Sequence, residues 1–389
     1  MIQPGRTQYA PTVDNHDFGS RHGMNSRGEL HSPDDRSSIV NSTELLERAF
    51  SLGASDLHIS TGAPAIFRVN GHLVYEGERL TTADTESFAR SIMSERQWEE
   101  FTATGELDFP LSTRFSRFRV NAYRQRGSCS AALRLIPPGI RTLAELGLPP
   151  CVSDLCALQR GLVLVTGPTG SGKSTTLAAM IDQVNSTRDC HIITLEDPIE
   201  YLHKHKKSIV NQREIGSDTV SYASGLRAVL RQDPDVILIG EMRDLESIAI
   251  ALTAAETGHL VFSTLHTIGA AKTIDRIVDV FPPHQQPQVR VQLSMALQGV
   301  ISQQLLPEAS GTGRVAAIEV MLATPAIRNL IREGKTPQIN NAILTAGLNG
   351  MQTMDASLAA LFKAGRISLD DCVLYCVEQE NLKRHLNLR

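Results

Sequence analysis

The sequence predicts an α/β protein whose main domain is a parallel sheet with helices on both faces. Short apolar runs occur at residues 161–166, 191–195, 235–240 and 260–264, and a segment long enough for a helix separates each run from the next. This alternation is typical of parallel sheets, and uninterrupted apolar runs are typical of strands buried on both faces. In addition, the first run leads directly into a glycine-rich loop that is followed by a helical segment.

Composition narrows the class of protein further. The 389 residues suggest two or three domains, and 41% hydrophobic residues suffice for packed cores. A formal net charge of −4 argues against a protein that binds nucleic acid through overall positive charge, so no stable nucleic-acid binding is expected. Apolar stretches of about 18 residues, which a membrane span needs, do not occur, and the first 30 residues lack a secretory signal, so we expect a cytoplasmic protein.

The cysteine pattern gives no support for a zinc module or a disulfide framework. None of the six cysteines forms a C-x-x-C pair with another. We expect the cysteines to be small residues of the hydrophobic core, in a protein of a reducing compartment. The six are Cys129, Cys151, Cys156, Cys190, Cys372 and Cys376.

The chain divides into four parts. Residues 1–39 form a polar extension with little aliphatic periodicity, which predicts disorder; Met24 within it also allows a later start. Residues 40–136 form a small α+β domain, and residues 137–142 form a linker that begins with two prolines. Residues 143–389 contain the parallel sheet, with a mainly helical region from about residue 282.

Within the small domain, apolar patterns predict an opening helix, strands, a helical stretch and further strands. Asn70-Gly71 indicates a hairpin turn between two of the strands. The expected helical segments are 43–52 and 82–103, and the expected strands are 56–59, 65–71, 72–75, 115–125 and 129–136. In the helical C-terminal region a single strand is expected, at residues 314–320.

The glycine-rich loop after the first apolar run fits the pattern G-x-x-x-x-G-K-S. Glycines allow successive backbone N–H groups to converge on an anion, Lys173 can reach the terminal phosphates, and the Ser174 hydroxyl can bind Mg²⁺. The predicted ligand is a Mg-nucleoside triphosphate, although the loop leaves open whether that ligand is hydrolysed. The binding residues are Gly167, Pro168, Thr169, Gly170, Ser171, Gly172, Lys173, Ser174 and Thr175.

Carboxylates follow two other apolar runs, at the sheet edge where ligands of parallel sheets bind. Glu196 and Asp197 follow the second run and are candidates for ordering Mg²⁺ directly or through water; a strand-end turn with solvated acids is the alternative. Glu241 follows the third run and is the better candidate for polarising an attacking water.

His259 and His266 lie at the two ends of the fourth run. The two histidines are seven residues apart across a strand, which differs from the spacing of two zinc ligands on one helix, so we do not expect a zinc site. A role in sensing the γ-phosphate or in coupling neighbouring segments remains open beside a purely structural role.

Together these motifs resemble those of the PilT family within the type II/type IV secretion ATPase superfamily, across residues 42–380. The corresponding signatures are a Walker A loop at 167–175, an Asp box at 194–200, an atypical Walker B strand at 236–241 and a His box at 258–267. The resemblance implies a PAS-like N-terminal domain followed by a RecA-like P-loop ATPase core. It also implies a hexameric motor ATPase of type IV pilus retraction and twitching motility, with ATP and Mg²⁺ as cofactors.

Further implications concern partners and particular residues. The family works as a homohexamer on an inner-membrane platform protein, so peripheral association with the cytoplasmic face is expected. Arg119 and Arg134 match arginines that the N-terminal domain donates to the nucleotide; exposed arginines on a sheet are the alternative. Residues 326–333 resemble a signature of retraction motors, or else form a packing helix with solvated Arg328 and Arg332. The basic run 204–207 is a membrane contact or a solvated loop.

Three alternative functions stay open. The first is a DotB/TraJ-type ATPase that energises a type IV secretion or conjugation system; this type shares the same core and likewise can lack zinc. The second is a non-motor nucleotide-binding scaffold. The third is a DNA-translocating ring, which would need basic pore loops that the sequence does not contain apart from residues 204–207.

Overall fold

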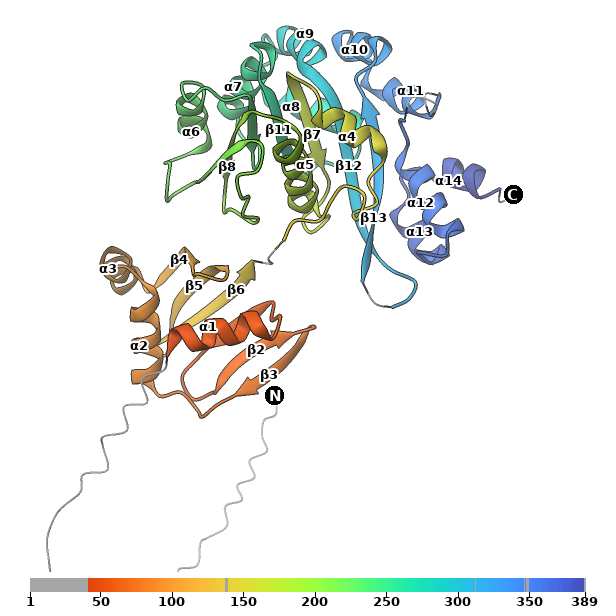
Figure 1. The fold of residues 1–389 in the computed structure, drawn as a ribbon. Helices are drawn as coiled ribbons and strands as arrows, with labels where there is room; N and C mark the ends of the chain where they lie inside the picture. Colours follow the sequence, from red (N-terminus) through yellow and green to blue (C-terminus); the bar gives the residue numbers. More distant parts are fainter. Residues whose placement is uncertain (1–40, 137–138, 312, 346, 348–349, 388–389) are drawn as a thin grey trace, which may run out of the picture. The chain divides into compact units, whose positions relative to one another are not determined.

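A computed structural model shows the architecture of the chain. It describes residues 41–387 apart from 137–138, 312, 346 and 348–349, and the extension predicted for residues 1–39 lies outside the described residues. Two sheets form the framework, one of six strands and one of seven (Figure 1). The predicted α/β class is confirmed.

The first sheet is antiparallel, in the order β3-β2-β1-β6-β5-β4. Its strands are β1 (Asp56–Ile59), β2 (Ala65–Val69), β3 (His72–Glu76), β4 (Glu106–Ser112), β5 (Arg117–Gln125) and β6 (Ser128–Ile136). The helices of this part are α1 (Ser42–Ser51), α2 (Thr82–Ile92) and α3 (Glu95–Thr104). Phe67, Phe88 and Phe118 are fully buried in its core.

Local sequence signals explain several of these elements. Asn70 and Gly71 have φ angles of +50° and +85°, as a tight two-residue hairpin turn requires, so the predicted turn is confirmed. Helices α2 and α3 both begin with a capping box, in which a hydroxyl and a side chain three residues later satisfy each other's backbone N–H groups.

The second sheet has the order β13-β12-β7-β11-β10-β8-β9, and all of its pairings are parallel except β12 with β13. Its strands are β7 (Gly161–Thr166), β8 (His191–Glu196), β9 (Ile209–Glu214), β10 (Val236–Ile239), β11 (Leu260–Leu265), β12 (Leu297–Pro307) and β13 (Arg314–Leu322). The four predicted parallel strands are confirmed to within one residue at each end.

Helices cover both faces of this sheet. Along β7, Leu162 and Leu164 belong to one hydrophobic cluster, whereas Val163 and Val165 belong to another on the opposite face. This alternation explains why the strand reads as an uninterrupted apolar run. The helices are α4 (Pro150–Cys156), α5 (Lys173–Thr187), α6 (Tyr222–Val229), α7 (Leu245–Glu256), α8 (Ala270–Asp279), α9 (Gln286–Ala296), α10 (Pro325–Arg332) and α11 (Ile339–Thr345), with a short 3₁₀ turn η1 (Thr336–Gln338).

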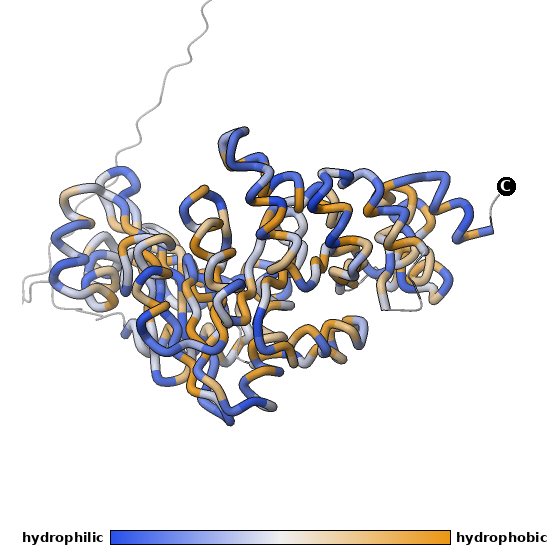
Figure 2. The backbone as a smooth tube through the Cα atoms, turned by 90° about the horizontal axis from the view of Figure 1, so that it is seen from above, coloured by the Kyte–Doolittle hydropathy of each residue, from blue (hydrophilic) through white to orange (hydrophobic). Residues whose placement is uncertain are grey.

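Three further helices, α12 (Met354–Lys363), α13 (Leu369–Tyr375) and α14 (Gln379–Leu386), end the described chain. They share a small core, in which Leu358 and Leu382 pack with Leu306 of β12. In Figure 2 the backbone leading to the C-terminus is largely hydrophilic, in keeping with a helix α14 that buries Leu382 and exposes charged residues.

The structure corrects the prediction that the region after residue 282 contains one strand. Leu297–Pro307 forms strand β12, which pairs with β7 on one side and β13 on the other. Polar residues Ser302, Gln303 and Gln304 interrupt its apolar pattern although all three are buried, and this concealed the strand. Strands β4 and β9 were also not anticipated.

Candidate nucleotide-binding site

The glycine-rich loop joins the end of β7 to the start of α5, as its motif requires. Gly167 has a φ of +143°, and a Cβ atom there would lie 2.2 Å from the carbonyl oxygen of Gln303, so no other residue fits this position. Gly172 has a φ of +89° and directly precedes Lys173, the first residue of α5. The loop therefore presents backbone N–H groups and a helix N-terminus together.

A cleft of about 520 Å³ opens over this loop. Residues at the carboxyl ends of β8, β10 and β11 complete its walls, because the parallel strands all end at this edge of the sheet. The sequence-predicted residues that line it are Thr169, Gly170, Gly172, Lys173, Ser174, Thr175, Glu196, Asp197, Glu241 and His266.

Lys173 is buried and folds back over the loop. Its ammonium donates hydrogen bonds to the carbonyl oxygens of Gly167 at 2.9 Å and Pro168 at 3.1 Å. Burial lowers the pKa of Lys173, and the nearby carboxylates of Glu200 and Glu241 partly oppose that shift. An added anion in the cleft would stabilise the charged ammonium.

Glu241 and His266 are joined at the same edge. His266 Nε2 lies 3.3 Å from Glu241 Oε2, and His266 Nδ1 lies 3.4 Å from the Lys173 ammonium. One neutral tautomer satisfies both contacts, with Nε2–H donating to the carboxylate and Nδ1 accepting from Lys173. The other oxygen of Glu241, Oε1, forms an ion pair of 2.8 Å with Arg243, a residue that sequence reasoning missed.

Glu196 ends strand β8 and is held by two side chains. Its Oε1 accepts hydrogen bonds from Thr194 Oγ1 at 2.6 Å and from Gln212 Nε2 at 3.1 Å. Burial raises the pKa of Glu196, and these hydrogen bonds limit the rise. The carboxyl group is thus fixed in place beside the loop, at a position where a bound cation would favour its ionised form.

The residues of the cleft fit a Mg-nucleotide. Among the described residues no group of three or more His, Cys, Asp or Glu side chains could hold a metal ion. Mg²⁺ bound with a nucleotide needs no such cage, because it keeps several waters and takes most other ligands from phosphate oxygens. Ser174 and Glu196 line the same cleft and can supply one or two oxygens.

The two predicted arginines lie elsewhere. Arg119 and Arg134 are cross-strand neighbours on β5 and β6. Arg134 is largely exposed and pairs with Asp56 at 3.0 Å. Within the described part of the chain, neither arginine lines the cleft above Lys173. Their assignment to the nucleotide therefore remains a prediction that needs a domain movement or a second subunit.

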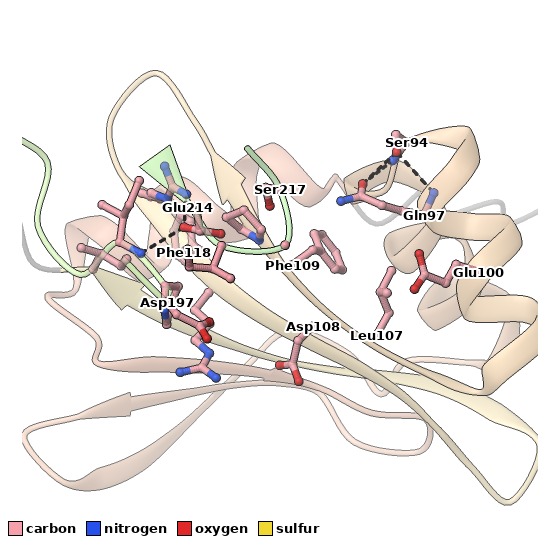
Figure 3. Close-up of a pocket in the computed structure, with 18 of the residues that line it drawn as sticks. Ser94, Gln97, Glu100, Leu107, Asp108, Phe109, Phe118, Asp197, Glu214 and Ser217 are labelled. Atoms are coloured by element: carbon pink, nitrogen blue, oxygen red, sulfur yellow. Dashed lines mark hydrogen bonds and ion pairs between the residues drawn. The ribbon is translucent and has the colours of Figure 1, made fainter. Parts of the chain in front are cut away.

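Arg119 lines a second cavity, of about 500 Å³. Asp197 and Glu214 line the same cavity (Figure 3). Here Arg117 of β5 forms an ion pair of 2.6 Å with Glu214 at the end of β9, and both side chains are at most 13% exposed. The same oxygen of Glu214 accepts a hydrogen bond of 3.0 Å from the backbone N–H of Ile199. Arg117 and Glu214 were not predicted, since no local motif links residues 97 positions apart.

His259 lies at the far end of strand β11 from His266. Its Nδ1 contacts the carbonyl oxygen of Ala254 at 2.9 Å, at the C-terminal end of helix α7. The next residue, Leu260, pairs with Gly161 at the start of β7, whereas the loop begins at the other end of β7. His259 and the loop are therefore separated by the whole length of the strand. Its predicted contact with nucleotide is not supported within one chain, because a parallel strand spans the sheet from edge to edge.

Helix α10 and its C-cap residue Glu333 contain the segment 326–333 that resembles a retraction-motor signature. Ile327 and Ile331 are fully buried and Leu330 packs against the same cluster, as the predicted apolar face requires. Arg328 differs from the sequence-based expectation of a solvated side chain. Its guanidinium donates to the carbonyl oxygens of Ser294 at 2.7 Å and Met295 at 2.9 Å, and so caps the C-terminal end of α9.

The fold and the cleft define a P-loop nucleotide-binding protein of the α/β class. Residues 32–363 match the family described as type II/IV secretion system protein, and the chain belongs to that family. It is similar to the "Type IV pilus retractation ATPase PilT" of Pseudomonas aeruginosa strain PAO1, at 51% identity over 85% of this chain and 96% of that protein.

Two solved structures are also similar. A crystal structure of the pilus retraction motor PilT with bound ADP matches with a TM-score of 0.83 and 52% identity, over 88% of this chain and 98% of that one. The structure of the Legionella pneumophila ATPase DotB matches with a TM-score of 0.74 and 32% identity, over 85% of this chain and 94% of that one. In the described part of the chain, no helix is both long and apolar enough to span a membrane.

Proposed function

We propose that the chain is a motor ATPase that converts ATP hydrolysis into disassembly of a type IV pilus. The observation that carries the hydrolytic part is the contact of His266 with both Lys173 and Glu241 in one cleft. A retraction role is supported by similarity to PilT along nearly the whole of that protein.

In this proposal the nucleotide phosphates occupy the cleft over the loop. Lys173 exchanges its contacts with loop carbonyls for contacts with phosphate oxygens, and backbone N–H groups of the loop bind the same anion. Glu241 orients water and accepts its proton, while His266 keeps the carboxylate aligned with Lys173. Bound Mg²⁺, held by Ser174 and through water by Glu196, would neutralise charge on the phosphates.

The motor step requires a nucleotide site that becomes complete only when another part of the protein moves against it. We propose that Arg119 and Arg134 reach the nucleotide only when the N-terminal sheet closes on it, or from a neighbouring subunit. An arginine supplied in this way is worth about 10³- to 10⁵-fold in rate. A homohexamer docked on a platform protein at the cytoplasmic face of the inner membrane would turn such closures into work.

Two other functions are considered, and the cleft bears on the second of them. An ATPase of a secretion or conjugation system is favoured by the similarity to DotB. A scaffold that binds nucleotide without doing work would not need Glu241 and His266 in contact with each other.

The test is genetic. The gene is deleted in its host and complemented with wild type or with Lys173→Ala, and surface pili, twitching and protein or DNA export are scored together. Excess pili with lost twitching, rescued by wild type alone, supports a retraction motor. Normal pili with failed export would assign the protein to secretion, and rescue of every phenotype by Lys173→Ala would argue against any role that needs bound nucleotide.

A further inference from the structure

Gln303 of strand β12 reaches beneath the phosphate-binding loop. Its Nε2 donates a hydrogen bond of 2.6 Å to the carbonyl oxygen of Ser171, which is 132 residues away in the sequence. Strand β12 pairs with β7 up to Ser302 and Thr166, so Gln303 follows at the level where β7 ends and the loop begins. The side chain of Gln303 is 2% exposed.

The backbone of the loop also passes close to Gln303 at both of its outer glycines. A Cβ atom at Gly167 would lie 2.2 Å from the Gln303 carbonyl oxygen, and one at Gly172 would lie 3.1 Å from Gln303 Nε2. These close approaches and the hydrogen bond to Ser171 place one residue of β12 next to the loop at Gly167, Ser171 and Gly172. Neither Lys173 nor Glu241 takes part in them.

The chemistry of the loop explains why a donor is needed there. A loop that turns its N–H groups toward an anion turns carbonyl groups the other way, and a buried carbonyl needs a hydrogen-bond donor. The Ser171 carbonyl can only accept, so it fixes which end of the Gln303 amide faces it. The other end, Oε1, is buried and has no hydrogen-bond partner among the described residues.

The part of Gln303 that contacts the loop is therefore its N–H group, which donates to the Ser171 carbonyl oxygen.

We propose that Gln303 is a positioning residue that holds the phosphate-binding loop in its anion-binding shape. The proposal rests on the nucleotide site proposed above and adds a determinant of affinity to it. Without the amide, the segment from Gly170 to Gly172 loses the restraint on its carbonyl, and its N–H groups no longer converge before the ligand arrives. The loss should fall on nucleotide affinity and KM more than on kcat.

Strand β12 offers a matched control in the next residue. Gln304 is also buried, and its Nε2 donates to the carbonyl oxygen of Tyr375 at 3.1 Å, away from the loop. Both Gln303→Leu and Gln304→Leu remove one amide-to-carbonyl hydrogen bond from the same strand. Only the first one removes a contact with the phosphate-binding loop.

The experiment measures binding of Mg-ADP and Mg-ATP to full-length protein, together with Tm and steady-state kinetics. Gln303→Leu should raise Kd about tenfold, and Gln304→Leu should leave it within about twofold of wild type. An unchanged Kd in Gln303→Leu, or an equal rise in both variants, would overturn the proposal. If Gln303→Leu does not fold, Gln303→Met is measured in its place under the same criteria. Absence of binding by wild type would instead overturn the nucleotide site itself.

Discussion

His266 Nε2 lies 3.3 Å from Glu241 Oε2, and this contact joins the His box to the end of strand β10. Because the other nitrogen of the same ring lies 3.4 Å from the Lys173 ammonium, the proposed phosphate-binding residue and the residue proposed to orient water share one imidazole. A shift in Lys173 on nucleotide binding can therefore be transmitted to Glu241 through a single side chain.

Glu241→Gln should bind ATP with wild-type affinity and lose turnover by about 100-fold or more, because the amide keeps the shape of the side chain but cannot accept a proton. Nucleotide binding and steady-state ATPase rates are the measurements. Glu246→Gln is the control, since Glu246 is exposed on α7 and pairs with Arg227 at the surface. Wild-type turnover in Glu241→Gln would remove Glu241 from the mechanism.

His266 and Glu241 should act together in catalysis. His266→Asn, Glu241→Gln and the double variant form a cycle, and the double variant should lose little more turnover than Glu241→Gln alone, because His266 acts through the carboxylate. Fully multiplicative losses would mean that the two side chains act independently.

Glu196→Gln should stabilise the protein while impairing catalysis. A pKa that is raised in the folded state means that stability is fully present below the unfolded pKa of Glu196 and is lost as pH rises through the folded pKa. The variant should therefore exceed wild type in Tm by roughly 2 °C at pH 8, with the difference disappearing at acidic pH. Thermal melts of Mg-free protein from pH 4 to pH 8 measure this. A lower Tm than wild type at pH 8 would show that burial of Glu196 does not destabilise its charge.

Arg117→Met should lower the free energy of unfolding by about 3 kcal/mol, because it leaves the buried carboxylate of Glu214 without its cation. Adding Glu214→Gln should recover part of the loss, since the amide oxygen can still accept from the Ile199 N–H group. Denaturant titrations of the single and double variants provide the measurement. A double variant less stable than Arg117→Met would contradict this account.

Leu330→Ala should spare ATP hydrolysis more than pilus retraction, because Leu330 lies at the edge of the core on helix α10. Ile331→Ala is the matched control on the same helix. Ile331 is fully buried, and its truncation should cost about 2–5 kcal/mol of stability and reduce both activities. ATPase rates and twitching are measured in parallel. Equal loss of both activities in Leu330→Ala would reduce this helix to a packing element.

Several features could be predicted from the sequence because their signals are local. The glycines and Lys173 of the loop, the apolar runs before Glu196 and Glu241, and the Asn70-Gly71 turn each depend on residues within about ten positions. Parallel strands end at a common edge, so the meeting of Lys173, Glu196, Glu241 and His266 in one cleft also followed from the motif order.

Other features depend on contacts between distant segments. Strand β12 was concealed by buried polar residues whose partners, such as Ser171, lie elsewhere in the chain. The pairing of Arg117 with Glu214 and the exposed position of Arg134 depend on how whole sheets pack, which no local pattern encodes. The sequence by itself determined which residues could bind phosphate and which strands would deliver acids to them. Only the tertiary structure decided which side chains hold those residues in place, because hydrogen bonds and burial depend on distance in space and not on separation along the chain.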